Sequence, residues 1–140
     1  MGQNKMRIAL SLGLAVALSA SASAQVPNQF NAQCEYTTHS ERNLQSRATH
    51  TLVVDLINNQ WCVLFAGACT HIHMIVRTTD TTIVLQETLT PDSGVYRTLD
   101  RQSGLYHIRF YFMEGPMISR ALGTCRRQAF SGLVPAPRAF

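Results

Sequence analysis

The stretch LYHIRFYF at residues 105–112 decides the fold class, because its apolar and polar side chains alternate. Successive side chains of a β-strand point to opposite faces, whereas a helix repeats every 3.6 residues. The apolar face of such a strand would carry Tyr106, Ile108, Phe110 and Phe112. The other face would carry His107 and Arg109. The pattern predicts an amphipathic strand with one face in a core.

Runs rich in β-branched and apolar residues recur on both sides of this segment, at the spacing of about ten residues that is typical of short strands. They cover residues 51–57, 61–65, 70–78, 82–89, 95–100, 105–113 and 118–126. Turn-forming residues separate them, such as Asn58-Asn59 and the stretch 100–104, where Gly104 can take a positive φ. The sequence therefore predicts an all-β fold, an antiparallel meander of about six to eight strands that forms a small disulfide-bonded β-barrel or a curled sheet.

The predicted β domain occupies residues 50–130. Residues 25–33 are polar and show no periodicity, and residues 38–47 are a polar stretch that suits a loop or short helical turn. We therefore interpret residues 25–49 as an N-terminal lead-in. Pro135 and Pro137 disfavour a strand, so residues 131–140 are predicted to be a C-terminal tail.

The first 24 residues have the form of a secretory signal peptide, because Lys5 and Arg7 precede an apolar run at residues 8–18 and small residues follow. The apolar run is too short to span a bilayer, which takes roughly 20 residues. Cleavage between Ala24 and Gln25 would leave a periplasmic or secreted chain without a transmembrane segment. The alternative, a first helix of the domain itself, conflicts with the serine and alanine content before the cleavage site.

Charge, length and missing motifs restrict the function. Removing Lys5 and Arg7 lowers the formal net charge from +4 to +2, which disfavours nucleic acid as a partner. A chain of 140 residues with 46% hydrophobic residues fits one compact domain. The sequence contains no G-x-S-x-G, P-loop, H-E-x-x-H or C-x-x-C-H motif, so we expect a non-enzymatic protein without a cofactor.

Four cysteines, Cys34, Cys62, Cys69 and Cys125, all follow the predicted cleavage site. An even number in a small exported domain indicates two disulfides, for which three pairings are possible. We favour Cys62 with Cys69, which closes a short loop, and Cys34 with Cys125, which joins the two ends of the domain. The alternative, a Cys/His metal site, lacks the close C-x2-C spacing of zinc ribbons, and an oxidising compartment disfavours thiolate ligands.

Several short runs carry a resemblance to known proteins. They are DLINNQWC at residues 55–62, TTDTTIVL at 78–85, DRQSG at 100–104, GTC at 123–125 and AFSG at 129–132. Together they resemble a group of small uncharacterised exported proteins of alphaproteobacteria, over roughly residues 51–133. The chain departs from that pattern at Ala129, where a proline is expected before the phenylalanine. The resemblance implies a fold and a periplasmic address, and no activity.

His71 and His73 are the candidate metal ligands, because residues two apart in a strand point to the same face. Two ligands do not complete a site. The simpler interpretation is a strand whose polar face carries both histidines and whose other face supplies the core with Ile72, Met74 and Val76. On that interpretation, replacing both histidines changes stability by less than about 0.5 kcal/mol.

Two further groups are candidates for binding. Arg120, Arg126 and Arg127 form a basic cluster near the last cysteine, suited to an anionic partner such as lipopolysaccharide or an acidic protein face, or else to a solvated strand end.

The second group, Ser93-Gly94-Val95-Tyr96, is expected to be a loop and resembles part of the Ser-Gly-x-x-Tyr motif of periplasmic inhibitors of C-type lysozyme, which are small β-barrels. Here Tyr96 comes one residue early, and the chain after the cleavage site has no lysine to match a second motif. The same residues suit an ordinary turn. We therefore expect a non-enzymatic envelope protein that binds a ligand or partner, with a lysozyme-inhibitor-like β-barrel as the alternative.

Overall fold

A computed structural model of the chain describes residues 26–40, 44–112 and 119–137. The predicted signal peptide and its cleavage site lie outside the described residues. The described residues form nine strands and no helix. The strands are β1 (Gln29–Ser40), β2 (Gln45–Asp55), β3 (Gln60–Phe65), β4 (Ala68–Met74), β5 (Arg77–Thr78), β6 (Thr82–Leu89), β7 (Ser93–Asp100), β8 (Leu105–Phe112) and β9 (Ser119–Gln128).

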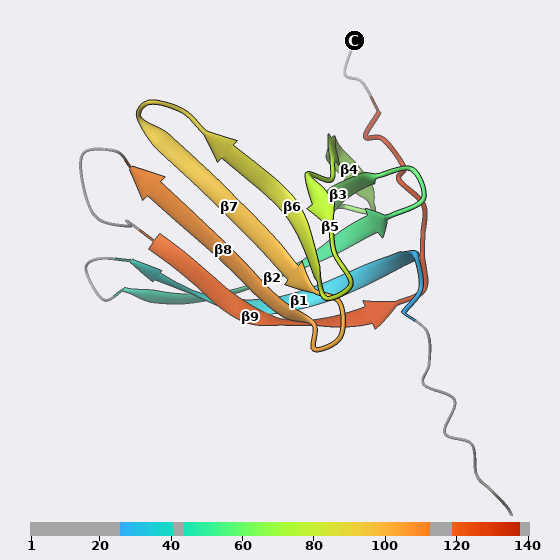
Figure 1. The fold of residues 1–140 in the computed structure, drawn as a ribbon. Coiled ribbons are helices and arrows are strands. Elements are labelled where there is room, and N and C mark those ends of the chain that lie inside the picture. The colour runs from blue at the N-terminus through green and yellow to red at the C-terminus, as the bar shows by residue number, and fades with distance from the viewer. Residues whose placement is uncertain (1–25, 41–43, 113–118, 138–140) are drawn as a thin grey trace, which may run out of the picture.

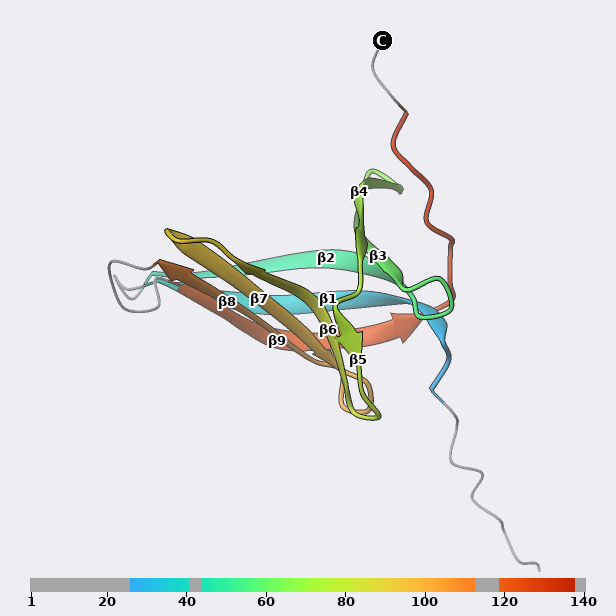
Figure 2. The ribbon, with the colours of Figure 1, turned by 45° about the horizontal axis from the view of Figure 1, so that its top comes forward.

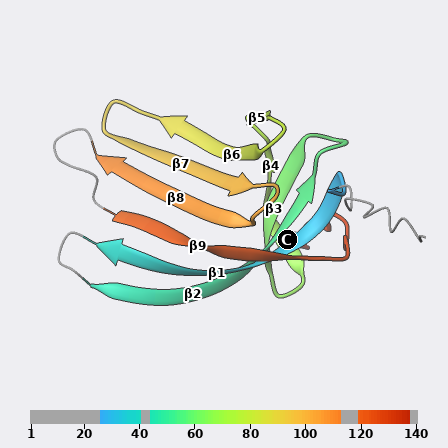
Figure 3. The ribbon, with the colours of Figure 1, turned by 60° about the horizontal axis from the view of Figure 1, so that its bottom comes forward.

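All nine strands belong to one antiparallel sheet with the order β4-β3-β2-β1-β9-β8-β7-β6-β5. The two edge strands, β4 and β5, follow each other in the chain and are joined by Ile75 and Val76. Ile75 N donates to the Asn59 carbonyl beside β3, and Val76 N donates to the Val84 carbonyl in β6, each at 2.9 Å. The joint holds the two edges together at one end, so the sheet curls into a half-barrel (Figures 1 and 3). The predicted all-β, antiparallel, curled sheet is confirmed.

The main core lies on the inner, concave face of this half-barrel. The alternation in β8 places Tyr106 (0% exposed) and Ile108 (3%) in that core, while Arg109, which follows Ile108 in the strand, is exposed. The other large buried side chains of the core come from several further elements: Phe30, Leu52, Val54, Trp61, Ile75, Ile83, Leu85 and Leu99. Both walls of the curl contribute, so curling is what removes these side chains from water.

The expectation of a lead-in at residues 25–49 was wrong. β1 begins at Gln29 and lies at the centre of the sheet, between β2 and β9. Its inner face carries Phe30, Ala32, Cys34 and Tyr36, a period-2 pattern of apolar residues that the polar residues between them mask. The strand count rises from the expected six to eight to nine because β1 is added and because residues 70–78 bend at Ile75 into β4 and β5.

Both disulfides are those favoured from the sequence. Cys34 and Cys125 are register partners on β1 and β9, with Cα atoms 3.9 Å apart, so their bond locks the central strand pair. The Cys62–Cys69 bond joins β3 to β4 across the hairpin. Two disulfides with no free cysteine indicate an oxidising, extracytoplasmic environment.

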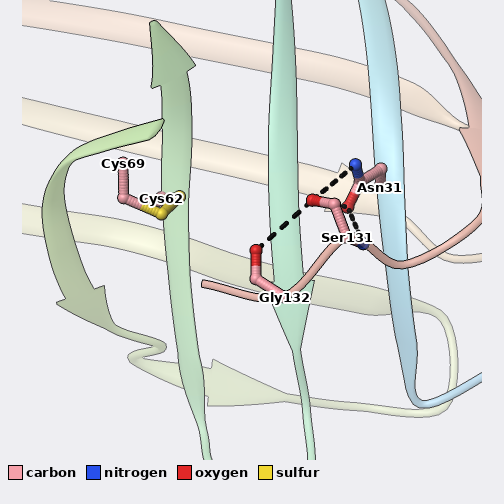
Figure 4. Close-up of a disulfide and its surroundings, with 5 residues drawn as sticks. All are labelled: Asn31, Cys62, Cys69, Ser131 and Gly132. Atoms are coloured by element: carbon pink, nitrogen blue, oxygen red, sulfur yellow. Dashed lines mark hydrogen bonds between the residues drawn. A yellow bond between two sulfur atoms is a disulfide. The ribbon is translucent and has the colours of Figure 1, made fainter. Parts of the chain in front are cut away.

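The C-terminal segment is not a free tail over its described part. It crosses the outer face of the sheet (Figures 2 and 4). There Cys69 N donates to the Val134 carbonyl at 2.7 Å and Ala136 N donates to the Cys69 carbonyl at 3.0 Å. The Asn31 amide nitrogen donates to Ser131 Oγ at 3.0 Å and fixes the start of the segment. Phe130 and Leu133 then pack on a second small cluster, formed by Val53, Cys62 and Cys69. The prolines prevent regular pairing, but edge-strand β4 supplies the bonds the segment needs.

Candidate functional site

A groove of about 390 Å³ lies on the outer face of the sheet near one edge. Its lining residues come from β5 to β8 and are Arg77, Glu87, Thr88, Leu89, Val95, Tyr96, Arg109 and Tyr111. The register explains its form, because two rows of side chains cross β6, β7 and β8 next to each other. One row is Glu87, Tyr96 and Arg109, and the other is Leu89, Gly94 and Tyr111.

Gly94 makes the hollow. It has no side chain at the centre of the second row, and a Cβ there would lie 3.0 Å from Leu89 Cδ1 and 3.8 Å from Tyr111 Cδ2. Leu89 is 80% exposed and Tyr111 36%, so both walls present apolar surface to solvent. Such a site can take an apolar or aromatic group between the two walls.

The row that contains Glu87 and Arg109 gives the groove a polar rim, and the two ends of this rim differ in charge. At one end Arg77 and Glu87 form an ion pair at 2.5 Å, which raises the pKa of Arg77 through the hydrogen bond and the charge of Glu87. At the other end Arg109 is the register partner of Arg120 on β9, so two arginine side chains start next to each other on the outer face. Among the described residues the Arg77–Glu87 pair is the only ion pair, so the Arg109 end carries uncompensated positive charge.

His107 belongs to this positive end and is held neutral. Arg109 Nε donates to His107 Nε2 at 3.3 Å. Burial lowers the pKa of His107, and the charges of Arg109 and Arg120 lower it further. The positive charge at this end therefore comes from guanidinium groups and not from an imidazolium.

The residues Ser93, Gly94 and Tyr96 do not form a loop, contrary to expectation. They lie in β7 and pair with β6 on one side and β8 on the other. The tight turn comes before them, where Thr90 N donates to the Ser93 carbonyl at 2.7 Å. Tyr96 nevertheless lines the groove, and Gly94 lies between its two apolar walls, although both residues are in a strand and not in a loop.

The predicted basic cluster of Arg120, Arg126 and Arg127 is not formed. Arg126 Nη2 donates to Gln33 Oε1 at 3.0 Å on the outer face, while Arg127 points inward, bonds the Arg101 carbonyl and lies over the Phe30 ring. Arg120 is six positions from Arg126, about 20 Å along a strand. Adjacent strand residues point to opposite faces, which is why nearness in sequence did not produce a cluster.

His71 and His73 do share a face, with ring centroids 6.2 Å apart, but it is the inner face. His73 stacks on Trp61 with 4.9 Å between ring centroids. The expected core face is exposed instead, with Ile72 at 40%, Met74 at 60% and Val76 at 47%. β4 is an edge strand at the rim of the curl, so little packs against its outer side. In the part of the chain that the structure describes, no three His, Cys, Asp or Glu side chains lie close enough to hold a metal.

Sequence reasoning missed Arg97, which lies on the inner face of β7. Its guanidinium carbon is 5.1 Å from the centroid of the Trp61 ring. Burial and the charge of Arg97 lower the pKa of His50 to about 4, and burial raises the pKa of Tyr106. The available signal was an arginine between Val95 and Leu99, at a position where the alternation requires a core residue.

Comparisons with known proteins give no further guide to this site. Within the described residues, no helix has the length and apolar character needed to cross a bilayer. No protein-family model, curated protein or solved structure matches the chain.

Proposed function

We propose that the chain is an exported, non-enzymatic protein of the bacterial periplasm or envelope, and that it binds a ligand or partner in the groove over Gly94. The single observation that carries the proposal is the groove itself. Its volume of about 390 Å³ falls in the range of ligand sites, and apolar walls lie beside a charged rim. The signal-peptide pattern at residues 1–24 supports export.

The chemistry of the groove favours binding over catalysis. Leu89 and Tyr111 offer contact area, and Arg109 offers a charge that has no ion-pair partner among the described residues. Glu87, the one carboxylate of the lining, is already engaged by Arg77, which suits it to fix the shape of the rim. A ligand with an apolar or aromatic body and a negative group matches both walls and rim.

A dye titration tests the proposal. An aromatic sulfonate dye whose fluorescence rises in apolar surroundings is added to wild type, to Leu89→Asp and to the control Leu122→Asp. Leu122 is an exposed leucine (48%) on the outer face of β9, outside the groove lining. We expect Leu89→Asp alone to weaken dye binding at least tenfold, and fractions of an envelope extract to displace the dye from wild type. Equal binding by both variants would contradict the proposal.

The alternative, inhibition of C-type lysozyme, has less support. The Ser93 to Tyr96 stretch lies inside β7 with strands on both sides, where it does not protrude as a cleft-blocking loop would. Lysozyme turnover measured with a stoichiometric excess of the protein tests this alternative directly.

A further inference from the structure

The inner face of the half-barrel carries a second polar site, on the side of the sheet away from the groove. Arg97 of β7 and His73 of β4 both lie against the ring of Trp61, although the two strands are far apart in the sheet order. Trp61 is 1% exposed, His73 is exposed and Arg97 is partly exposed. The curl therefore brings the side chains of Arg97 and His73, from strands far apart in the sheet order, against one buried indole.

The charge of Arg97 is not balanced by its surroundings. The only ion pair among the described residues is that of Arg77 with Glu87, on the outer face. His50, partly buried beside Arg97, is neutral at pH 7 because its pKa is lowered to about 4. Tyr106 is also neutral, because burial raises its pKa further above a usual value that already lies well above 7. A partly buried guanidinium among neutral groups is costly, and an anion nearby would offset that cost.

The hydrogen-bonding inventory points to the same kind of ligand. Arg97 Nε and Trp61 Nε1 are buried and have no hydrogen-bond partner among the described residues. The Tyr106 hydroxyl and His50 Nε2 are also buried and unpartnered, and each of these two groups can act as donor or acceptor. An arginine and an indole N–H can only donate. Arg97 and Trp61 thus contribute donors only, which an acceptor-rich group complements.

We propose that Arg97 and His73 bind an oxyanion, a carboxylate, phosphate or sulfate group, beside Trp61 on the inner face of the half-barrel. The guanidinium supplies paired N–H donors to two oxygens, and the His73 ring supplies one more. Neither residue lines the groove over Gly94, so this site is independent of the proposed function.

Binding at this site is linked to pH. The groups that face His73 are Trp61 from β3, Arg97 from β7 and His71 on its own strand. Burial lowers the pKa of His73, and the charges of His71 and Arg97 lower it further. A bound anion favours the protonated imidazole, so by linkage a lower pH favours the anion. We expect binding to be at least roughly fivefold tighter at pH 5.5 than at pH 8.

Trp61 is the only tryptophan of the chain, so in the folded protein tryptophan fluorescence reports on the surroundings of this indole. The purified, disulfide-bonded protein is titrated with sulfate, which stays a dianion over this pH range, and with chloride at matched ionic strength. Titrations with phosphate and with acetate then show whether the site prefers a phosphate group or a carboxylate group. The variants are Arg97→Gln, His73→Gln and the control Arg126→Gln, whose guanidinium lies on the outer face.

We expect a saturable response to sulfate and not to chloride in wild type and Arg126→Gln. The dissociation constant should rise at least tenfold in Arg97→Gln, and His73→Gln should bind sulfate at pH 8 but lose the pH dependence. Identical responses to sulfate and chloride, or a pH dependence that survives in His73→Gln, would overturn the proposal. If Arg97→Gln does not fold, the wild-type selectivity and the exposed His73 variant still decide the question.

The outcome is separable from that of the groove. The dye titration depends on Leu89 on the outer face, and the sulfate titration depends on Arg97 on the inner face. Loss of one response without the other identifies which site fails.

Discussion

Replacing Cys34 and Cys125 together by alanine should destabilise the protein by about twice as much as replacing Cys62 and Cys69. The two bonds join residues 91 and 7 positions apart. In the chain-entropy model, closing loops of these lengths in the unfolded chain stabilises the folded state by about 4.5 and about 2.5 kcal/mol. The bond across the longer loop stabilises the fold more, because the unfolded chain gains more freedom when that bond is removed.

Urea unfolding and thermal melting, both followed by Trp61 fluorescence, compare the two variants. At about 4 °C per kcal/mol for a chain of this length, the Cys34/Cys125 variant should melt roughly 8 °C below the Cys62/Cys69 variant. If the total unfolding free energy is small, the Cys34/Cys125 variant is unfolded at 25 °C while the Cys62/Cys69 variant still folds. This outcome gives the same ranking of the two variants. Equal destabilisation, or a greater loss in the Cys62/Cys69 variant, would refute the loop-length argument and indicate that packing around β3 and β4 dominates.

Three further outcomes follow from the contacts described above. Gly123→Ala should lower the unfolding free energy by about 3 kcal/mol, because its Cβ would lie 2.0 Å from a β1 carbonyl oxygen. The control Gly67→Ala, whose Cβ would have nothing within 4 Å, should lower it by about 1 kcal/mol. Urea titrations of the two variants compare these values. The pKa of His50 is about 4 in the folded protein and 6.5 in the unfolded chain, so the unfolded chain binds more protons between these pH values. The unfolding free energy should therefore fall by roughly 2 kcal/mol as the pH drops from 6.5 to 4, allowing for the partial exposure of His50. His50→Gln should flatten this pH dependence. His73→Gln should lower the unfolding free energy by about 1 kcal/mol through lost stacking on Trp61, and His71→Gln by less than about 0.5 kcal/mol. A chelator should shift neither the melting curve of wild type nor that of the double variant. A shift in wild type alone would favour a metal site.

The strands that the sequence predicts well are those whose turns are also marked. Residues 82–89 match β6, and the turn at 100–104 forms as expected, with Gly104 at φ 73° and Asp100 Oδ1 accepting from Gln102 N at 2.9 Å. Local chemistry is sufficient here, because a hairpin needs only its own turn and the alternation on either side.

The elements that the sequence misses depend on distant partners. β1 is polar enough to be interpreted as a loop, and it becomes a central strand because β9 supplies its second neighbour. The inward orientation of His73 depends on Trp61, and the position of residues 131–137 depends on Cys69. Such contacts cannot be inferred from periodicity, which reports only whether two faces differ and not what covers each of them.

The same limit applies to the candidate sites. Gly94 and Tyr96 were singled out as part of a loop motif, but the structure places them in a strand. Their place at the groove depends on Leu89 and Tyr111 on the neighbouring strands. Arg97 was missed because a lone arginine in an apolar alternation is meaningful only once the curl of the sheet places Trp61 beside it.

Among the described strand pairings, β1 with β9 is the one that joins segments distant in sequence; each of the others connects neighbours in the chain. Two meanders, β1 to β4 and β5 to β9, can therefore form early through local contacts. The pairing of β1 with β9 between them can form only after the last strand has been synthesised. Loop closure over such a distance is slow compared with hairpin formation. The centre of the finished sheet is thus the last part to fold, and until β9 arrives one edge of β1 stays open to pairing with other chains.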